Sequence, residues 1–130
     1  MSSSPEFDAR VGIITAFLDG IGDLDFERVA QCLTDDAVMT LPFLDIPLTN
    51  GRAAIVGQLS ASVPRMFERM NFFYDAWYDA GPDTVIAEYH SVCPLKDRPG
   101  EYRNSYITVF GFRGNQIGLY KEYLNPTRMA

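Results

Sequence analysis

The 130-residue sequence predicts an α+β domain, in which helices come first and a curved, mostly antiparallel sheet follows. In the N-terminal half, apolar residues recur at helical spacing in three segments. In the C-terminal half, the period changes to the alternation typical of strands, and short polar turns separate four such runs. This length suits one domain, so we expect a single domain over 1–130 with a flexible N-terminal tail at 1–4.

The first helix is predicted over residues 5–20, where one apolar stripe follows Pro5, a residue suited to a first helical turn. A second, shorter helix is predicted within 24–33. The third helix follows a turn at 50–51, and Pro64 is expected to bend or end it.

The strands are expected to form an antiparallel meander, because they follow one another in sequence and are joined by short turns. A short strand should precede the third helix, within 34–43. The four long strands are predicted in the stretches 69–80, 84–95, 103–112 and 116–126. Helices that cover a strongly curved sheet produce a cone, and the interior of a cone is a natural pocket.

Composition narrows the class of function. The formal net charge is −6 and no basic run is present, which disfavours nucleic acids and anionic membranes as partners. The first residues contain no apolar signal segment and no stretch reaches membrane-spanning length, so we expect a cytoplasmic protein. Cys32 and Cys93 are expected to be buried and unpaired.

The sequence supplies no pattern for a cofactor. A single histidine without a cysteine pair cannot provide a zinc ligand set, and no glycine-rich phosphate loop is present. We therefore expect neither a metal nor a cofactor. Aromatic residues make up 13% of the chain, and such side chains line apolar pockets as well as cores.

Two segments carry a resemblance to a known superfamily. "GDLDFERVAQCLTDDAVMTLPF" resembles the N-terminal half of nuclear transport factor 2-like (ketosteroid isomerase-like) proteins, and "EYRNSYITVFGFRGNQIGLYKEYLNP" resembles their SnoaL-like branch. The resemblance implies a cone-shaped sheet wrapped around N-terminal helices. Both faces of the last two strands carry apolar residues, so we expect one face to line a ligand-binding cavity and the outer face to form a homodimer. Members include isomerases, polyketide cyclases, dehydratases, epoxide hydrolases and proteins without catalytic activity, so the fold does not decide the activity.

The acid/base residues of the ketosteroid isomerase branch have no counterpart here. Its tyrosine on the first helix corresponds to Thr15, its aspartate base to Leu41, and its acid on the penultimate strand to Ile107 or Thr108. The phenazine-biosynthesis branch is a closer local match. Its glutamate in the last strand corresponds to Glu122, although its histidine in the loop and helix region has no equivalent in this chain.

Strand alternation then suggests the candidate site, because side chains of one strand face share a parity. Glu122 is the expected acid/base residue and His90 its proton partner. The expected ligand-binding residues are Glu88, Asn104, Tyr106, Tyr120 and Asp45. Each of these residues also has a structural interpretation, as an interface charge, a hydrogen-bonded histidine or a core aromatic, and a one-residue shift of register would move any of them to the other face of the sheet.

These observations predict a small-molecule-binding protein with an apolar cavity for a small hydrophobic or aromatic metabolite. If it is an enzyme, cofactor-free acid/base chemistry is expected: isomerisation, cyclisation, dehydration or hydration. The alternative is a non-catalytic ligand-binding or dimeric interaction module with the same cavity.

Overall fold

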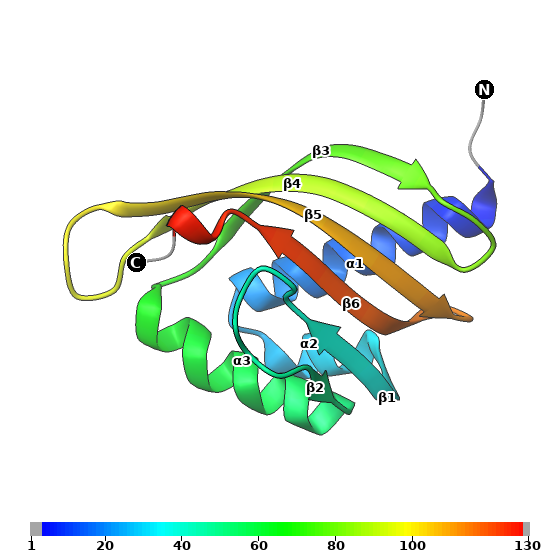
Figure 1. Cartoon of the computed structure of the whole chain (residues 1–130), viewed down its shortest axis with the longest axis horizontal. Coiled ribbons are helices and arrows are strands. Elements are labelled where there is room, and N and C mark those ends of the chain that lie inside the picture. The colour runs from blue at the N-terminus through cyan, green and yellow to red at the C-terminus, as the bar shows by residue number, and fades with distance from the viewer. Residues whose placement is uncertain (1–3, 129–130) are drawn as a thin grey trace.

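The computed structural model describes residues 4–128, in which helices cover one side of a curved sheet (Figure 1). The helices are α1 (Pro5–Gly22), α2 (Phe26–Gln31) and α3 (Arg52–Met66). The strands are β1 (Leu33–Thr40), β2 (Thr49–Asn50), β3 (Asn71–Asp79), β4 (Thr84–Pro94), β5 (Glu101–Arg113) and β6 (Gln116–Leu124). A 3₁₀ turn, η1 (Pro126–Arg128), ends the described chain.

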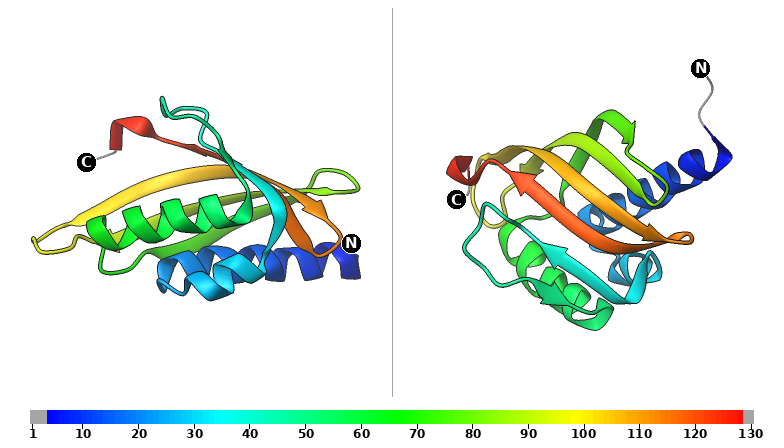
Figure 2. Two further views of the ribbon diagram at one scale, coloured as in Figure 1. Left: turned by 90° about the horizontal axis from the view of Figure 1, so that it is seen from below. Right: turned by 45° about the vertical axis from the view of Figure 1, so that its right-hand side comes forward.

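The predicted α+β architecture and the four-strand meander are confirmed. The strand order is β2-β1-β6-β5-β4-β3, and β3 to β6 pair antiparallel in sequence order. Two features were not predicted: β1 pairs with β6 in parallel, and the two-residue β2 adds to the edge of β1. The two views of Figure 2 show how the sheet curves over the helices, with α3 near β1 and α1 under the long strands.

Helix ends follow local capping. Ser4, which we expected in the flexible tail, accepts a hydrogen bond from the backbone N–H of Phe7 at 3.0 Å and caps α1; the rest of that tail, 1–3, lies outside the described residues. The side chain of Asp25 caps α2 in the same way. Helix α3 passes through Pro64 and ends two residues later, at Met66.

The core lies where α1 meets the concave face of the sheet. Phe17 is fully buried, and its ring meets that of Tyr120 edge-on, with centroids 5.0 Å apart. Phe110 stacks on the same tyrosine at 5.6 Å. Cys32 and Cys93 are buried free thiols, as expected. The aromatic contacts fix Tyr120 between helix and sheet, and this position matters for the site described below.

A buried arginine joins α1 to the turns at the far end of the sheet. The guanidinium of Arg10 donates to the carbonyl oxygens of Pro82 at 2.6 Å and Gly114 at 3.2 Å, and lies 5.1 Å from the ring centre of Phe112. It also pairs with Glu6 at 2.9 Å. The side chain therefore links the β3–β4 turn, the β5–β6 turn and the first helix.

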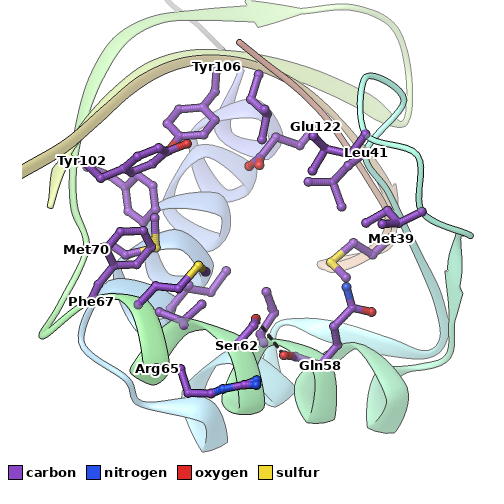
Figure 3. A pocket seen from close by; sticks show the side chains of 18 of the residues that line it. Met39, Leu41, Gln58, Ser62, Arg65, Phe67, Met70, Tyr102, Tyr106 and Glu122 are labelled. Atoms are coloured by element: carbon purple, nitrogen blue, oxygen red, sulfur yellow. Dashed lines mark hydrogen bonds between the residues drawn. The ribbon is translucent and has the colours of Figure 1, made fainter. Parts of the chain in front are cut away.

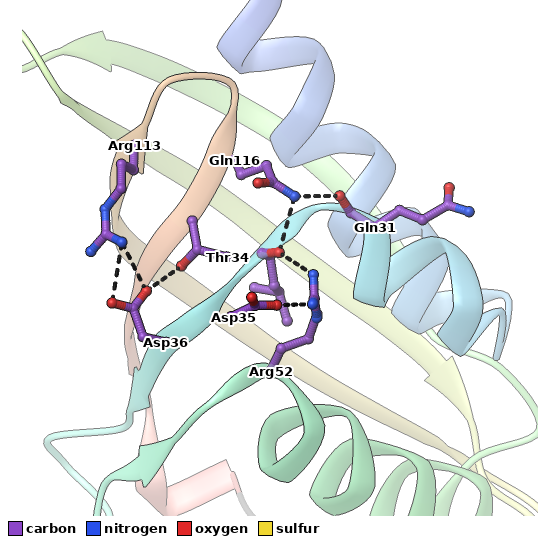
Figure 4. Close-up of polar contacts among 8 residues, drawn as sticks. Gln31, Thr34, Asp35, Asp36, Arg52, Arg113 and Gln116 are labelled. Atoms are coloured by element: carbon purple, nitrogen blue, oxygen red, sulfur yellow. Dashed lines mark hydrogen bonds and ion pairs between the residues drawn. The ribbon is translucent and has the colours of Figure 1, made fainter.

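A second polar cluster holds the start of β1 against its neighbours (Figure 4). Arg113 donates to both carboxylate oxygens of Asp36 at 3.1 Å, and Arg52 pairs with Asp35. Gln116 donates to the carbonyl oxygen of Leu33 at 3.2 Å. The β1–β6 register shifts between Leu33 and Val38, so these side chains bridge the segment where the regular ladder is interrupted.

We expect Arg10→Met to lower the free energy of unfolding by about 2 kcal/mol, because the charged hydrogen bonds of the buried guanidinium to two turn carbonyl oxygens are lost. Arg113→Met is the matched control. Its ion pair with Asp36 is solvent-exposed, so we expect a much smaller loss for this variant. Urea denaturation followed by circular dichroism measures both values. Equal losses for the two variants would contradict the bracing role of Arg10.

Candidate functional site

A cavity of about 430 Å³ lies between the concave face of the sheet and α3 (Figure 3). Its wall is mostly apolar. The polar side chains in the wall come from four segments: β5, β6, α3 and the β4–β5 loop. The lining residues are Ile21, Met39, Leu41, Leu44, Ile46, Gln58, Leu59, Ser62, Val63, Arg65, Met66, Phe67, Met70, Phe72, Leu95, Lys96, Arg98, Tyr102, Tyr106, Tyr120, Glu122 and Leu124. Its volume suits a small metabolite.

Glu122 carries the one carboxyl group in this wall. The residue is only 6% exposed, and Figure 3 shows its carboxyl group pointing into the cavity. Oε2 accepts hydrogen bonds from the hydroxyls of Tyr120 at 2.6 Å and Tyr89 at 2.7 Å. Oε1 has no hydrogen-bond partner among residues 4–128 and is not sealed from the cavity. The carboxyl group is therefore anchored by one oxygen and free at the other.

A second layer of polar side chains stands behind Glu122. The hydroxyls of Tyr89 and Thr108 are 2.7 Å apart. A phenol has one hydrogen to donate, and Tyr89 gives it to Glu122. Thr108 therefore donates to the Tyr89 oxygen. This fully buried arrangement fixes the orientation of the carboxyl group.

Burial raises the pKa of Glu122, and the hydrogen bonds from Tyr120 and Tyr89 oppose part of that shift. Burial, followed by the nearby Glu122 charge, raises the pKa of both phenols far above their usual range. The two tyrosines thus remain protonated donors. Oε2 already accepts two hydrogen bonds, so Oε1 is the oxygen at which Glu122 can take up or release a proton.

The remaining polar wall is a string of side chains on β4 and β5. The Tyr106 hydroxyl is 2.7 Å from Ser91 Oγ and also interacts with the hydroxyl of Tyr102. Asn104 Nδ2 donates to the Tyr102 oxygen at 2.5 Å. Asn104 itself does not line the cavity. It accepts from the backbone N–H of Asn125 and so fixes the chain after β6.

The structure brings Glu122, Tyr106 and Tyr120 together in the cavity wall, whereas the other four expected site residues, Glu88, His90, Asn104 and Asp45, do not line it. His90 and Glu88 lie on the outer face of the sheet, so the expectation that they approach the cavity is corrected. His90 stacks on Phe73 at 5.2 Å and its Nδ1 is 2.8 Å from Asp75; Glu88 accepts from the Tyr78 hydroxyl. The alternation predicted for β4 is right, but its cavity face is the opposite one.

Sequence reasoning therefore missed Tyr89, Ser91 and Thr108. The sequence of β4 did contain a usable signal. The strand face that carries Tyr89 also carries Val85, Ala87 and Cys93, so it is the more apolar of the two faces of β4. All three residues are buried in the structure. Asp45 is exposed in the loop before β2 and does not line the cavity, although Leu44 and Ile46 beside it do.

Residues 4–128 contain no group of three or more histidine, cysteine, aspartate or glutamate side chains placed to bind a metal ion. No helix in this range is long and apolar enough to cross a membrane.

The fold and the cavity define the class of protein: a nuclear transport factor 2-like domain with a curved six-stranded sheet around an apolar pocket. The chain matches the SnoaL-like domain over residues 14–119. It belongs to the SnoaL-like family.

Relatives agree with this assignment. A curated Bacillus subtilis protein, the uncharacterized protein YesE, is 26% identical over 125 residues, which are 93% of this chain and 84% of that protein. The crystal structure of a provisionally assigned isomerase of Bacillus subtilis superposes with a TM-score of 0.85 at 24% identity, covering 96% of this chain and 92% of the other. An epoxide hydrolase of Mycobacterium tuberculosis, described as LEH-like, gives a TM-score of 0.79 at 20% identity, over 96% and 89% of the chains. At these identities the structures show a shared fold.

The raised pKa of Glu122 makes stability depend on pH. A carboxyl group with a higher pKa in the folded than in the unfolded state stabilises the fold below its unfolded value of about 4.3, and this contribution is lost as the pH rises through the folded pKa. Glu122→Gln keeps the acceptor for Tyr89 and Tyr120 but does not ionise. We expect the stability of the variant relative to wild type to increase with pH across that window and then level off.

Urea denaturation at pH values between about 4 and 8 measures this difference. The matched control is Glu27→Gln, because Glu27 is exposed on α2 and its variant should show no such rise. Parallel pH profiles for wild type and Glu122→Gln would show that Glu122 titrates like a solvated carboxyl group.

Proposed function

We propose that this protein binds a small hydrophobic or aromatic metabolite in the cavity and transfers a proton to or from it without a cofactor. The observation that carries the proposal is Glu122, a single buried carboxyl group held by two tyrosine hydroxyls in an otherwise apolar wall. Burial raises the pKa of Glu122, which makes its ionised form a better proton acceptor than a solvated carboxylate. Isomerisation is the simplest reaction of this class, and cyclisation or dehydration use the same proton transfer.

In the proposed step, ionised Glu122 takes a proton onto Oε1 from a carbon next to a ligand carbonyl. The electron pair of that C–H bond forms a carbon–carbon double bond, and a pair from the C=O bond moves onto the carbonyl oxygen. The enolate then regains the proton from Oε1 at the same or another carbon, so that glutamate is restored. Tyr120 and Tyr89 keep their hydrogen bonds to Oε2 throughout. They hold the carboxyl group in place and disperse its charge when it is ionised.

The Tyr102 and Tyr106 hydroxyls would stabilise the developing charge. Both residues line the cavity, and the hydrogen bonds from Asn104 to Tyr102 and between Tyr106 and Ser91 hold their hydroxyls in place. Donors that are already oriented need little rearrangement when negative charge appears on a ligand oxygen. His90 has no part in this proposal, because it lies on the other face of the sheet.

The proton-transfer proposal predicts that wild-type protein catalyses deuterium uptake from D₂O into the acidic C–H positions of small ketones that carry an aromatic ring, with 2-tetralone as the first member of the panel. Glu122→Gln should reduce the catalysed rate about 10²- to 10⁴-fold. NMR follows the loss of the proton signal. The control Glu27→Gln should keep the wild-type rate.

An exchange rate in Glu122→Gln equal to that of wild type would overturn the assignment of Glu122. Ligand NMR shows whether each ketone binds to the wild-type protein. Binding without deuterium exchange above background would instead support the second candidate, a ligand-binding module without catalysis. The observation that favours this second candidate is the lack of a second carboxyl or imidazole group in the cavity wall.

We propose a homodimer formed through the outer face of the sheet. Phe73, Tyr78 and Ile107 lie on this face with 47–48% of each side chain exposed. The face is therefore apolar and aromatic enough to need cover, which is typical of an interface rather than of a monomer surface.

We expect light scattering at about 10 µM to give twice the chain mass, since a standard interface buries about 800 Å² per partner. Ile107→Glu places a charge in the proposed interface and should give monomers with an unchanged circular dichroism spectrum. Leu48→Glu is the matched control, because Leu48 is 53% exposed in the loop before β2. A wild-type monomer at this concentration would contradict the proposal.

A further inference from the structure

One end of the cavity is cationic although the protein as a whole is acidic. Arg65, Lys96 and Arg98 line the cavity and are exposed to solvent, so their charged groups belong to its mouth. The formal net charge of the chain is −6, so a randomly chosen patch of its surface would carry more acidic than basic side chains. Within residues 4–128, none of the three cations forms an ion pair.

The backbone brings these side chains together from two distant segments. The N–H of Lys96 donates to the carbonyl oxygen of Met66 at 3.0 Å, and Phe67 forms a bridge with Leu95. These contacts attach the β4–β5 loop to the C-terminal end of α3, where Arg65 occupies the last turn. The convergence of the cations is thus built into the fold and does not depend on chance side-chain positions.

Acidic residues of the same segments stay out of the cavity. Asp97 lies between Lys96 and Arg98 in sequence, with a φ of 61°, but does not line the wall, and neither does Glu68. The acid that does line it, Glu122, is buried and comes from the opposite wall; Figure 3 shows Glu122 and Arg65 on opposite sides of the cavity. The cavity is therefore polarised, with cations at the solvent end and a buried carboxyl group across an apolar interior.

We propose that the ligand is an amphiphilic anion: an apolar, ring-sized body carrying one carboxylate, sulfonate or phosphate group at the end that remains at the mouth. Arg65 and Arg98 can each offer paired N–H donors to such a group, and Lys96 adds a third charge. The inverse orientation is disfavoured because it would bring an anion against Glu122 in an apolar interior. The anion thus sets the direction of entry and leaves the apolar body beside Glu122 and Tyr106.

This inference rests on the proposed function, because it takes the cavity as the ligand-binding site. Its own claim concerns only the charge of that ligand. Catalysis at Glu122 could fail while the anion preference holds, and the reverse is equally possible. The test therefore uses binding alone, with two fluorescent probes that share one aromatic body. 8-Anilinonaphthalene-1-sulfonate carries a sulfonate, and N-phenyl-1-naphthylamine is the same molecule without it.

We expect wild-type protein at low ionic strength to bind the sulfonate probe about tenfold more tightly than the neutral probe, as three solvent-exposed charge contacts together allow. Added salt should reduce this preference, because exposed charges are screened. The triple variant Arg65→Gln, Lys96→Gln, Arg98→Gln should lose the preference and still bind the neutral probe as wild type does. Circular dichroism checks that the variant is folded.

The matched control is Arg28→Gln, which removes one positive charge from α2, outside the cavity wall, and should keep the preference. The test measures binding alone, so its result is separate from the outcome of the exchange assay. Equal affinities of wild type for the two probes would overturn the inference, as would the lack of sulfonate-probe binding or an equal loss of both affinities in the triple variant.

Discussion

A carboxyl group can stay inside an apolar wall only if its environment supplies hydrogen bonds, and much of this molecule is arranged to supply them to Glu122. Tyr120 reaches Oε2 from the same strand, while Tyr89 reaches it from β4, two strands away in the sheet. Phe17 of α1 packs edge-on against Tyr120, so the first helix also takes part in holding the acid. Without these donors, the burial of the charged form would cost several kcal/mol, and the neutral acid would lose its fixed orientation.

The position of this acid separates the chain from the ketosteroid isomerase pattern that it resembles. That pattern places an acid on the penultimate strand, where the inward-facing residue here is Thr108. Thr108 is the cross-strand partner of Glu122. The carboxyl group of this chain therefore comes from β6 instead of β5, at the same level of the sheet. Thr108 contributes to its orientation through a hydrogen bond with Tyr89. Leu41, at the position of the family's aspartate base, adds an apolar side chain to the cavity wall.

Most of the fold could be predicted from sequence because strand alternation and helical periodicity are local signals. The alternation along β5 and β6 correctly put Tyr106, Tyr120 and Glu122 on one face. The parallel contact of β1 with β6 was missed, since it joins segments about eighty residues apart and β1 has no turn signal that indicates its partner. The cavity face of β4 was assigned wrongly because two titratable residues, Glu88 and His90, were weighted above the more apolar face.

The site also depends on contacts that no periodicity encodes. Arg65 lies at the end of a helix and Lys96 and Arg98 in a loop some thirty residues later, and each alone is an ordinary surface cation. They become one feature only through the backbone contacts of the β4–β5 loop with the residues that end α3. Glu122, on β6, is the buried acid of the cavity wall, and the cations lie at the exposed rim. A ligand that is apolar at one end and anionic at the other would match both ends at once, because only its apolar end can enter without bringing a second negative charge to a buried acid.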